Sequence, residues 1–441
     1  MREKHCLQQG FCNSGAKLQI STVFLRFNIC AKLKICASIA PPSQSPKTLV
    51  AIFENRTMKH ILLILTTFLT LACNGQEPKQ SQFALTVSPI IDKTDKTNQT
   101  IIETLTEFLK TKNSSLTENK NWLQSDFQKF IYPYLDIYNI ENSKYGSDFF
   151  RPTLMEIIPT EKPSQKVVKT AFIGHNNETK ENQLKSIYNI VANIHQDKVL
   201  FSRYLDFTTQ KWKTVTKGSL TYRISPNKII NDTEIADQEK DIDKICNFFQ
   251  CKPISITYYS CIDPKELFEI KGFDYNPMMY VDKTGGLADY GNIIFSGNNS
   301  EIYTHEIVHI YTNTLFPNIN KFLDEGIATY IAGSGKFDYA WHREKFEKFL
   351  TENKDFDFKE HIDPYERLYF EGETSIPYLT AALILERTKR VYGDKKIIEL
   401  LKSEKEFWQA LNLVGLTQEN INEELRKEIK LPLTAVCRNG G

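Results

Sequence analysis

The feature of this sequence that most limits its possible folds is a pair of histidines set four residues apart in a helical pattern. His305 and His309 lie within residues 300–316, where apolar residues recur at helical spacing and Pro317 follows. Four residues make just over one helical turn, so both imidazoles project from one face, with Cβ atoms roughly 6 Å apart. The pattern therefore predicts a helix whose two histidines can bind one metal ion.

Glu306 completes the pattern His-Glu-x-x-His, and a carboxylate in this position can take a proton from a water molecule. The chain has only 8 histidines, so a chance occurrence of the pattern is on the order of 1%. The alternative is a helix with two buried histidines that bind nothing. We expect Asn299 or Ser300 to cap this helix and Glu301 to lie in its first turn.

A catalytic zinc site needs a third protein ligand and one open coordination position. Residues 322–330 contain a candidate, Glu325, which follows His309 by sixteen positions. That spacing allows a turn and an antiparallel return past the metal, and Gly326 would allow the two helices to approach closely. Asp324 is the rival ligand, and a solvated helix carboxylate is the alternative for Glu325.

Residues 305–309 (HEIVH) and 322–330 (FLDEGIATY) together resemble the gluzincin superfamily. Specifically, the sequence resembles the peptidase MA-like proteins, which are related to thermolysin and to the aminopeptidase N catalytic domain. The resemblance extends over about residues 235–430. The resemblance implies an α+β chain with a zincin-like, thermolysin-like catalytic domain at residues 227–441, mostly helical with a small sheet.

The resemblance also implies a role for each motif residue. One Zn²⁺ ion would be held by His305, His309 and Glu325, and Glu306 would be the general base. Zinc lowers the pKa of a water molecule to roughly 7, so that Glu306 can accept its proton and return it to the leaving amine. The implied activity is zinc-dependent hydrolysis of peptide bonds in a peptide or protein substrate.

A further likeness concerns Tyr378. The segment Ile376–Tyr378, followed by Arg390–Gly393, is similar to the family segment whose tyrosine hydrogen-bonds the tetrahedral intermediate. Carried over, Tyr378 would donate a hydrogen bond to the oxyanion. The alternative is an aromatic core residue of a helix over 376–392.

Two departures from the family pattern limit the assignment. The GxMEN motif that grips a free substrate amine is absent, and residues 285–290 read Gly-Gly-Leu-Ala-Asp-Tyr instead. An aminopeptidase assignment thereby loses its main support, although this segment could pair with a substrate backbone as a strand or form only a turn. Thermolysin-like enzymes also carry an aspartate where Thr329 stands here, which leaves the partner that orients the histidine unassigned.

Two other functions stay open at this point. One is a catalytically silent, gluzincin-like lipoprotein that serves binding or assembly. The other is hydrolysis of an amide that is not a peptide, because the sequence reveals no specificity pocket. Peptide turnover that disappears with a chelator and returns with zinc would separate the peptidase from the silent protein.

Residues 58–72 resemble a bacterial lipoprotein signal peptide. A basic start at Lys59 precedes an apolar run from Ile61 to Leu71 and the small Ala72, and Cys73 follows. The run is too short to span a bilayer. The alternatives are an uncleaved signal anchor or a buried strand.

This resemblance implies that Cys73 becomes lipid-modified and anchors the protein in the bacterial cell envelope, on the periplasmic or the cell-surface leaflet. Residues 1–57 then lie upstream of the native start and are a non-native extension. Residues 73–84 are rich in Gln, Pro and Lys and are expected to form a flexible tether.

Residues 85–226 are expected to form a separate α+β domain. Ile101, Leu105, Phe108 and other apolar residues of 100–112 recur at helical spacing, and Thr100 with Glu103 can form a capping box. The order loosely resembles a nuclear-transport-factor-like or cystatin-like cone. The expected strands are 166–174, 186–195, 197–205 and 211–224.

The following domain, residues 227–441, begins with a different order of elements. We expect a helix at 231–249, a strand at 254–260, strands near 278–283 and 290–296, and then almost unbroken helix. Cys246, Cys251, Cys261 and Cys437 would either form two disulfides or remain as free thiols, since their spacing contains no CxxC pair.

The net charge of the chain argues against a nucleic-acid partner. From residue 73 onward the chain carries 46 basic and 52 acidic residues, once the 9 basic and 2 acidic residues before it are removed from the totals of 55 and 54. A net charge of −6 offers phosphate backbones no attractive surface, so we expect no nucleic-acid partner. The expected membrane contact is the lipid on Cys73.

Overall fold

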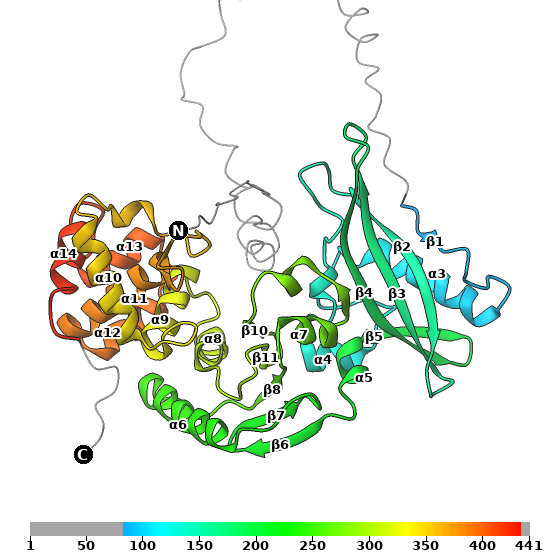
Figure 1. Ribbon diagram of the computed structural model, residues 1–441, viewed down its shortest axis with the longest axis horizontal. Helices are drawn as coiled ribbons and strands as arrows, with labels where there is room; N and C mark the ends of the chain where they lie inside the picture. Colours follow the sequence, from blue (N-terminus) through cyan, green and yellow to red (C-terminus); the bar gives the residue numbers. More distant parts are fainter. Residues whose placement is uncertain (1–82, 434–441) are drawn as a thin grey trace, which may run out of the picture. The chain divides into compact units, whose positions relative to one another are not determined.

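The computed structural model describes residues 83–433 and belongs to the α+β class, as predicted (Figure 1). The expected extension 1–57, signal peptide 58–72, lipid site Cys73 and most of the tether lie outside the described residues, as does Cys437. No helix within residues 83–433 has the length and apolar content that a bilayer crossing requires.

The first sheet is long and mostly antiparallel. Its strand order is β1-β2-β3-β4-β5, and β9 pairs with β4. The predicted strands 166–174, 186–195 and 197–205 are confirmed as β3, β4 and β5. The elements are β1 (Thr86–Val87), β2 (Phe150–Pro159), β3 (Gln165–His175), β4 (Asn182–His195), β5 (Lys198–Arg203) and β9 (Phe273–Tyr275).

The predicted N-terminal helix is confirmed as α3 (Lys96–Thr111), and its apolar stripe is buried. The expected capping box at Thr100 is wrong. The helix begins earlier because the side chain of Asp95 accepts a hydrogen bond from Asn98 N at 2.8 Å, while Thr100 donates to the carbonyl of Lys96. The likeness to a cone-shaped fold stays a prediction.

Three short helices lie between strands of this sheet in sequence, two between β1 and β2 and one after β5. They are α4 (Gln124–Phe130), η1 (Leu135–Ile137) and α5 (Tyr204–Thr208). Side chains of α4 and α5 share a core cluster with the second sheet, since Phe130 and Leu205 are buried together with Phe295. The expected division of the chain at residue 226 therefore crosses a continuous apolar core.

The second sheet has the strand order β10-β11-β8-β7-β6. Strands β7, β8 and β11 are parallel, and the two edge strands β6 and β10 run antiparallel to their neighbours. Its elements are β6 (Lys213–Lys217), β7 (Leu220–Ile224), β8 (Ile256–Ser260), β10 (Gly286–Asp289) and β11 (Ile293–Ser296).

This sheet corrects two expectations. The run 211–224 forms two strands, because Gly218 turns the chain at φ 54°. Both strands belong to the second sheet, so residues 213–224 pair with the part of the chain that was assigned to the following domain. The strand expected near 278–283 is instead the short helix η2 (Pro277–Tyr280), whose first residue is a proline, and the strand begins later, at Gly286.

Helices cover this sheet and continue to the end of the described chain. The predicted helix 231–249 is confirmed as α6 (Asp232–Phe249), capped by Asn231. Most helices after β11 pack into one apolar cluster. The remaining elements are α7 (Pro264–Lys271), α8 (Thr304–Leu315), α9 (Lys321–Ala332), α10 (Tyr339–Glu352), η3 (Phe358–Glu360), β12 (Tyr369–Phe370), β13 (Thr374–Ser375), α11 (Ile376–Tyr392), α12 (Asp394–Leu401), α13 (Phe407–Leu411), η4 (Asn412–Val414) and α14 (Ile421–Glu428).

Gly326 permits a close helix contact, but with a different helix from the one expected. A Cβ added at Gly326 would lie 2.5 Å from the Cβ of Ala381, which belongs to α11 rather than α8. The described cysteines Cys246, Cys251 and Cys261 carry free thiols. The disulfide alternative is therefore not seen among them.

Candidate metal centre

Helix α8, which carries both histidines, begins at Thr304, several residues later than expected. The residue before it, Tyr303, offers no side-chain cap, and its backbone N–H donates to Gln238 Oε1 of α6 at 2.7 Å. Glu301, expected in the first helical turn, is instead fully buried and pairs with Lys228 Nζ at 2.8 Å. His305 consequently lies in the first turn of the helix.

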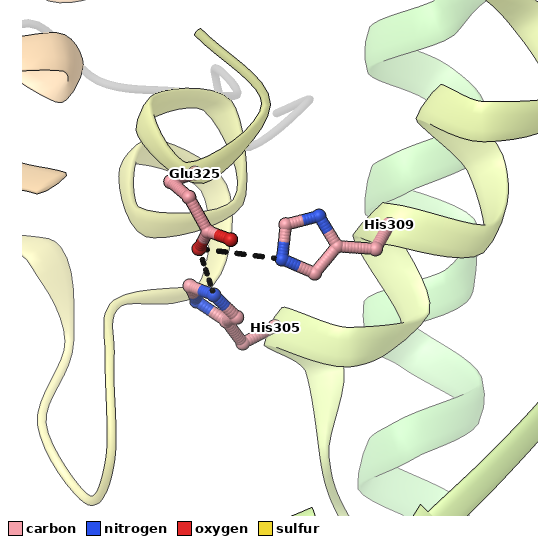
Figure 2. A group of neighbouring side chains, drawn as sticks. All are labelled: His305, His309 and Glu325. Atoms are coloured by element: carbon pink, nitrogen blue, oxygen red, sulfur yellow. Dashed lines mark hydrogen bonds and ion pairs between the residues drawn. The ribbon is translucent and has the colours of Figure 1, made fainter. Parts of the chain in front are cut away.

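The structure brings His305, His309 and Glu325 together (Figure 2). Glu325 Oε2 lies 3.4 Å from His305 Nε2 and 3.5 Å from His309 Nε2. The ligand atoms of all three lie within 4.8 Å of one another. Donor atoms placed tetrahedrally at about 2 Å from a zinc ion would be about 3.3 Å apart, and both distances from Glu325 Oε2 are close to that value, so these residues could hold one such ion.

The Nδ1 atom of each histidine, on the side of the ring away from Glu325, also lies close to an oxygen atom. His305 Nδ1 lies 2.7 Å from the carbonyl oxygen of Gly333, at the end of α9. A carbonyl can only accept a hydrogen bond, so His305 Nδ1 carries a hydrogen, and Nε2, on the other side of the ring, faces Glu325. His309 Nδ1 lies 3.1 Å from Asp324 Oδ1, which is within ion-pair distance but does not have the geometry of a hydrogen bond.

Asp324 therefore contacts the outer side of a histidine and is not part of the group formed by the three candidate ligands. It is 2% exposed, and its carboxylate accepts hydrogen bonds from Thr312 Oγ1 at 2.6 Å and Lys321 Nζ at 3.0 Å. The sequence left the orienting partner unassigned. The sequence did contain one hint. Asp324 directly precedes Glu325 on the same helix, so its side chain points in a different direction from that helix.

Thr329 stands where thermolysin-like enzymes have their orienting aspartate. Its hydroxyl is buried and has no hydrogen-bond partner within the described part of the chain. Here the carboxylate beside His309 comes from Asp324, five positions earlier on the same helix.

The charged side chains of the cluster shift one another's pKa values toward the ionised forms. Burial would raise the pKa of Glu325, but the neighbouring His309 and His305 lower it well below its usual range. Burial would lower the pKa of His309, whereas the charges of Asp324 and Glu325 raise it well above 6.5. Glu325 is therefore an anion at neutral pH, as a metal-ligating carboxylate must be.

Glu306 is held by the edge strand of the second sheet. Its Oε2 accepts a hydrogen bond from Ala288 N at 2.8 Å. In the antiparallel pairing of β10 with β11, Gly297 N donates to Gly285 O, so by alternation the Ala288 N–H faces the free edge of β10. Residues 286–289 thus form a strand rather than only a turn, and the free edge of that strand faces Glu306.

Tyr378 lies near the cluster, in the first turn of α11. Its ring is 6.2 Å from that of His305 between centroids, with an angle of 14° between the planes. Burial, and after it the charge of Glu325, raises the pKa of Tyr378 well above 10. The hydroxyl therefore stays protonated and can donate a hydrogen bond. The side chain is half-buried, whereas its neighbours Pro377 and Leu379 are buried.

The sequence did not single out Tyr365, in the loop before β12. Burial, and after it the charge of Glu325, raises the pKa of Tyr365 to about 12. This tyrosine belongs to no motif and lies forty positions after Glu325 in sequence, so no local spacing could have identified it.

No protein-family model matches the chain. A search of curated proteins finds no match either. Assignment of the site therefore depends on its residues and their geometry.

Proposed function

We propose that this protein is a zinc-dependent peptidase of the gluzincin type, with a zincin-like catalytic region. The observation that carries the proposal is the convergence of His305 Nε2, His309 Nε2 and a Glu325 oxygen within 4.8 Å. Oxygen atoms beside Nδ1 of both rings support it, the Gly333 carbonyl for His305 and the Asp324 carboxylate for His309, because such partners are typical of metal-ligating histidines. His305, His309 and Glu325 would hold the ion.

When bound, zinc would polarise the substrate carbonyl and lower the pKa of a water molecule to roughly 7. Glu306 is the group that accepts the proton of that water and delivers it to the leaving amine. Its carboxylate has two oxygens, and the Ala288 N–H holds one of them at 2.8 Å. The other oxygen can then receive the proton without the side chain changing its position.

Tyr378 supplies a neutral hydroxyl for the oxyanion that forms at the substrate carbonyl. A preorganised donor of this kind lowers a barrier by on the order of 3 kcal/mol. Apart from the Ala288 N–H, which is bonded to Glu306, the free edge of β10 offers backbone groups to an extended peptide, which supports a peptide or protein substrate.

Zinc removal tests the proposal. We expect the purified chain from residue 74 onward to contain one zinc per molecule and to cleave members of a peptide library. Cleavage should stop with a chelator and return with added zinc. Glu306→Gln should keep the zinc and lose turnover, because it retains the side-chain shape but cannot take a proton. Glu325→Ala should lose the zinc.

Two results would contradict this assignment. Equal loss of metal in both variants would show that the ligand and the base are misassigned. A folded, zinc-loaded protein that cleaves no peptide would instead favour the catalytically silent binding or assembly protein.

We also propose that the protein is a lipoprotein anchored in the bacterial cell envelope through Cys73. Support comes from the basic, apolar and small-residue pattern of 58–72. In a bacterial host, the full chain should incorporate a labelled fatty acid and the Cys73→Ser variant should not. Labelling that persists in the variant would disprove Cys73 as the lipid site.

A further inference from the structure

The edge strand that holds Glu306 is short and is paired on one side only. Strand β10 spans Gly286–Asp289 and lies at the end of its sheet. A short edge strand with one neighbour gains little rigidity from its ladder. Because the Ala288 N–H bonds to Glu306 at 2.8 Å, the position of that carboxylate depends on what keeps β10 in place.

The last residue of β10 enters a network of buried charges. Asp289 Oδ2 accepts hydrogen bonds from Arg203 Nη2 at 2.7 Å and from Lys271 Nζ at 3.2 Å. Asp136 completes the network, 3.1 Å from Lys271 Nζ and 3.5 Å from Arg203 Nη2. The Arg203 and Lys271 side chains are each 3% exposed, so solvent screens these interactions little.

The members of this network come from distant parts of the sequence. Asp136 belongs to η1 and Arg203 ends β5, both before the second sheet begins, whereas Lys271 ends α7. The guanidinium of Arg203 also lies 4.9 Å from the ring centroid of Phe130. The N-terminal part of the chain thus supplies both charge and apolar contact to the strand beside Glu306.

The turn between β10 and β11 has further contacts with the same N-terminal segment. Tyr290 packs edge-on against Tyr132, with ring centroids 4.5 Å apart. At Gly291, where φ is +79°, an added Cβ would overlap the carbonyl oxygen of Lys129. The hairpin is therefore held by α4 and the residues after it, as well as by its own sheet.

We propose that Arg203 and Asp289 are positioning residues for Glu306. Their ion pair, buried between the N-terminal segment and the second sheet, holds strand β10 so that the Ala288 N–H directs the carboxylate. This assigns a task to the N-terminal part of the chain, which completes the edge of the site instead of forming an independent domain. The expected effect on catalysis rests on the proposed peptidase function. The expected effect on the position of β10 does not.

The kinetic test uses Asp289→Asn, Arg203→Met and Arg203→Lys in the otherwise intact chain. Asp289→Asn keeps the size of the side chain and removes its charge. We expect kcat on a cleaved peptide to fall at least tenfold in Asp289→Asn and Arg203→Met, with a smaller change in KM and one zinc per molecule retained. Arg203→Lys should recover part of the loss because it restores the positive charge.

Arg387→Met is the matched control. Arg387 is also nearly buried and pairs with Glu424 at 2.6 Å, but between α11 and α14, away from β10. Its loss should leave kcat per folded molecule within twofold of wild type. An equal fall in this control, or an unchanged kcat in Asp289→Asn, would overturn the proposal.

Hydrogen exchange gives a readout that needs no activity. Measured by mass spectrometry on the intact chain, the backbone amides of residues 286–290 should exchange at least tenfold faster in Arg203→Met and Asp289→Asn than in wild type, and at the wild-type rate in Arg387→Met. Unchanged exchange in both variants would overturn the positioning role. If exchange changes as expected but wild-type protein cleaves no peptide, the positioning of β10 stands and the peptidase function fails.

Discussion

At the scale of single residues, the site depends on two adjacent carboxylates with different tasks. Glu325 points to the Nε2 atoms of both histidines, whereas Asp324 contacts Nδ1 of His309 from outside. Adjacent helix positions are about 100° apart around the axis, so the two side chains reach opposite sides of the same ring. Sequence alone named Glu325 as the ligand and Asp324 as its rival, but it could not place Asp324 beside Nδ1 of His309.

Removal of the orienting carboxylate should weaken zinc binding without abolishing it. We expect Asp324→Ala to lower zinc affinity about 10- to 100-fold, the usual cost of losing a partner that orients a ligating histidine. Competition with a chromophoric chelator would measure this. Thr329→Val, which changes a buried hydroxyl without a hydrogen-bond partner among the described residues, is the control and should bind zinc as wild type does. Unchanged affinity in Asp324→Ala would show that Asp324 does not orient His309.

Tyr378→Phe tests the oxyanion donor. The change removes one hydroxyl and keeps the ring beside His305. We expect kcat to fall about 10²- to 10³-fold with zinc content unchanged, because the hydrogen bond is needed mainly in the transition state. Steady-state kinetics on a cleaved peptide would check it. An unchanged kcat in Tyr378→Phe would show that Tyr378 is only a packing residue of α11.

At the scale of elements, helices α9 and α11 approach closely at Gly326. A Cβ there would lie 2.5 Å from Ala381 Cβ, which is closer than two methyl groups can pack. Gly326→Ala should therefore lower the free energy of unfolding by about 1–3 kcal/mol, the usual cost of overpacking. Urea titration would measure it. Ala381→Gly in the same chain should recover part of the loss, and an unaffected Gly326→Ala would mean that the helices can separate without cost.

Local patterns predicted the interiors of elements better than their ends. The apolar stripe of α3 and the whole of α6 follow from helical spacing, and β3, β4 and β5 from β-branched runs. The start of α8 was missed because Tyr303 N is satisfied by Gln238, a residue far away in sequence. Where a distant side chain satisfies the first helical N–H groups, a local cap such as Ser300 is not needed.

At the scale of the whole molecule, residues from Leu85 onward form one compact unit. The second sheet takes β6 and β7 from before residue 226 and β8, β10 and β11 from after it. A boundary placed by the change in local pattern could not reveal this, because strand pairing joins segments regardless of where the pattern changes.

The buried network that joins these parts should make stability depend on pH. Burial would raise the pKa of Asp289, but the charges of Lys271 and Arg203 lower it below its ordinary value of 3.8. A carboxylate with a lowered folded-state pKa contributes stability above the unfolded-state pKa and loses it as pH falls toward the folded-state value. Asp289→Asn should therefore cost most stability at pH 6 and progressively less below about pH 4. Urea titrations of both proteins at pH 6 and pH 3 would measure the difference, and an equal cost at both would contradict the ion pair.

The sequence by itself determined the helix with two histidines on one face and a glutamate on the next helix, because helical periodicity is a local property. It also determined the α+β class. Only the tertiary structure decided that Asp324 lies beside Nδ1 of His309, that the Ala288 N–H bonds to Glu306, and that Gly326 contacts α11. Each of these contacts joins atoms whose distance depends on how helices and sheets pack, and packing is set by the whole chain rather than by any one segment.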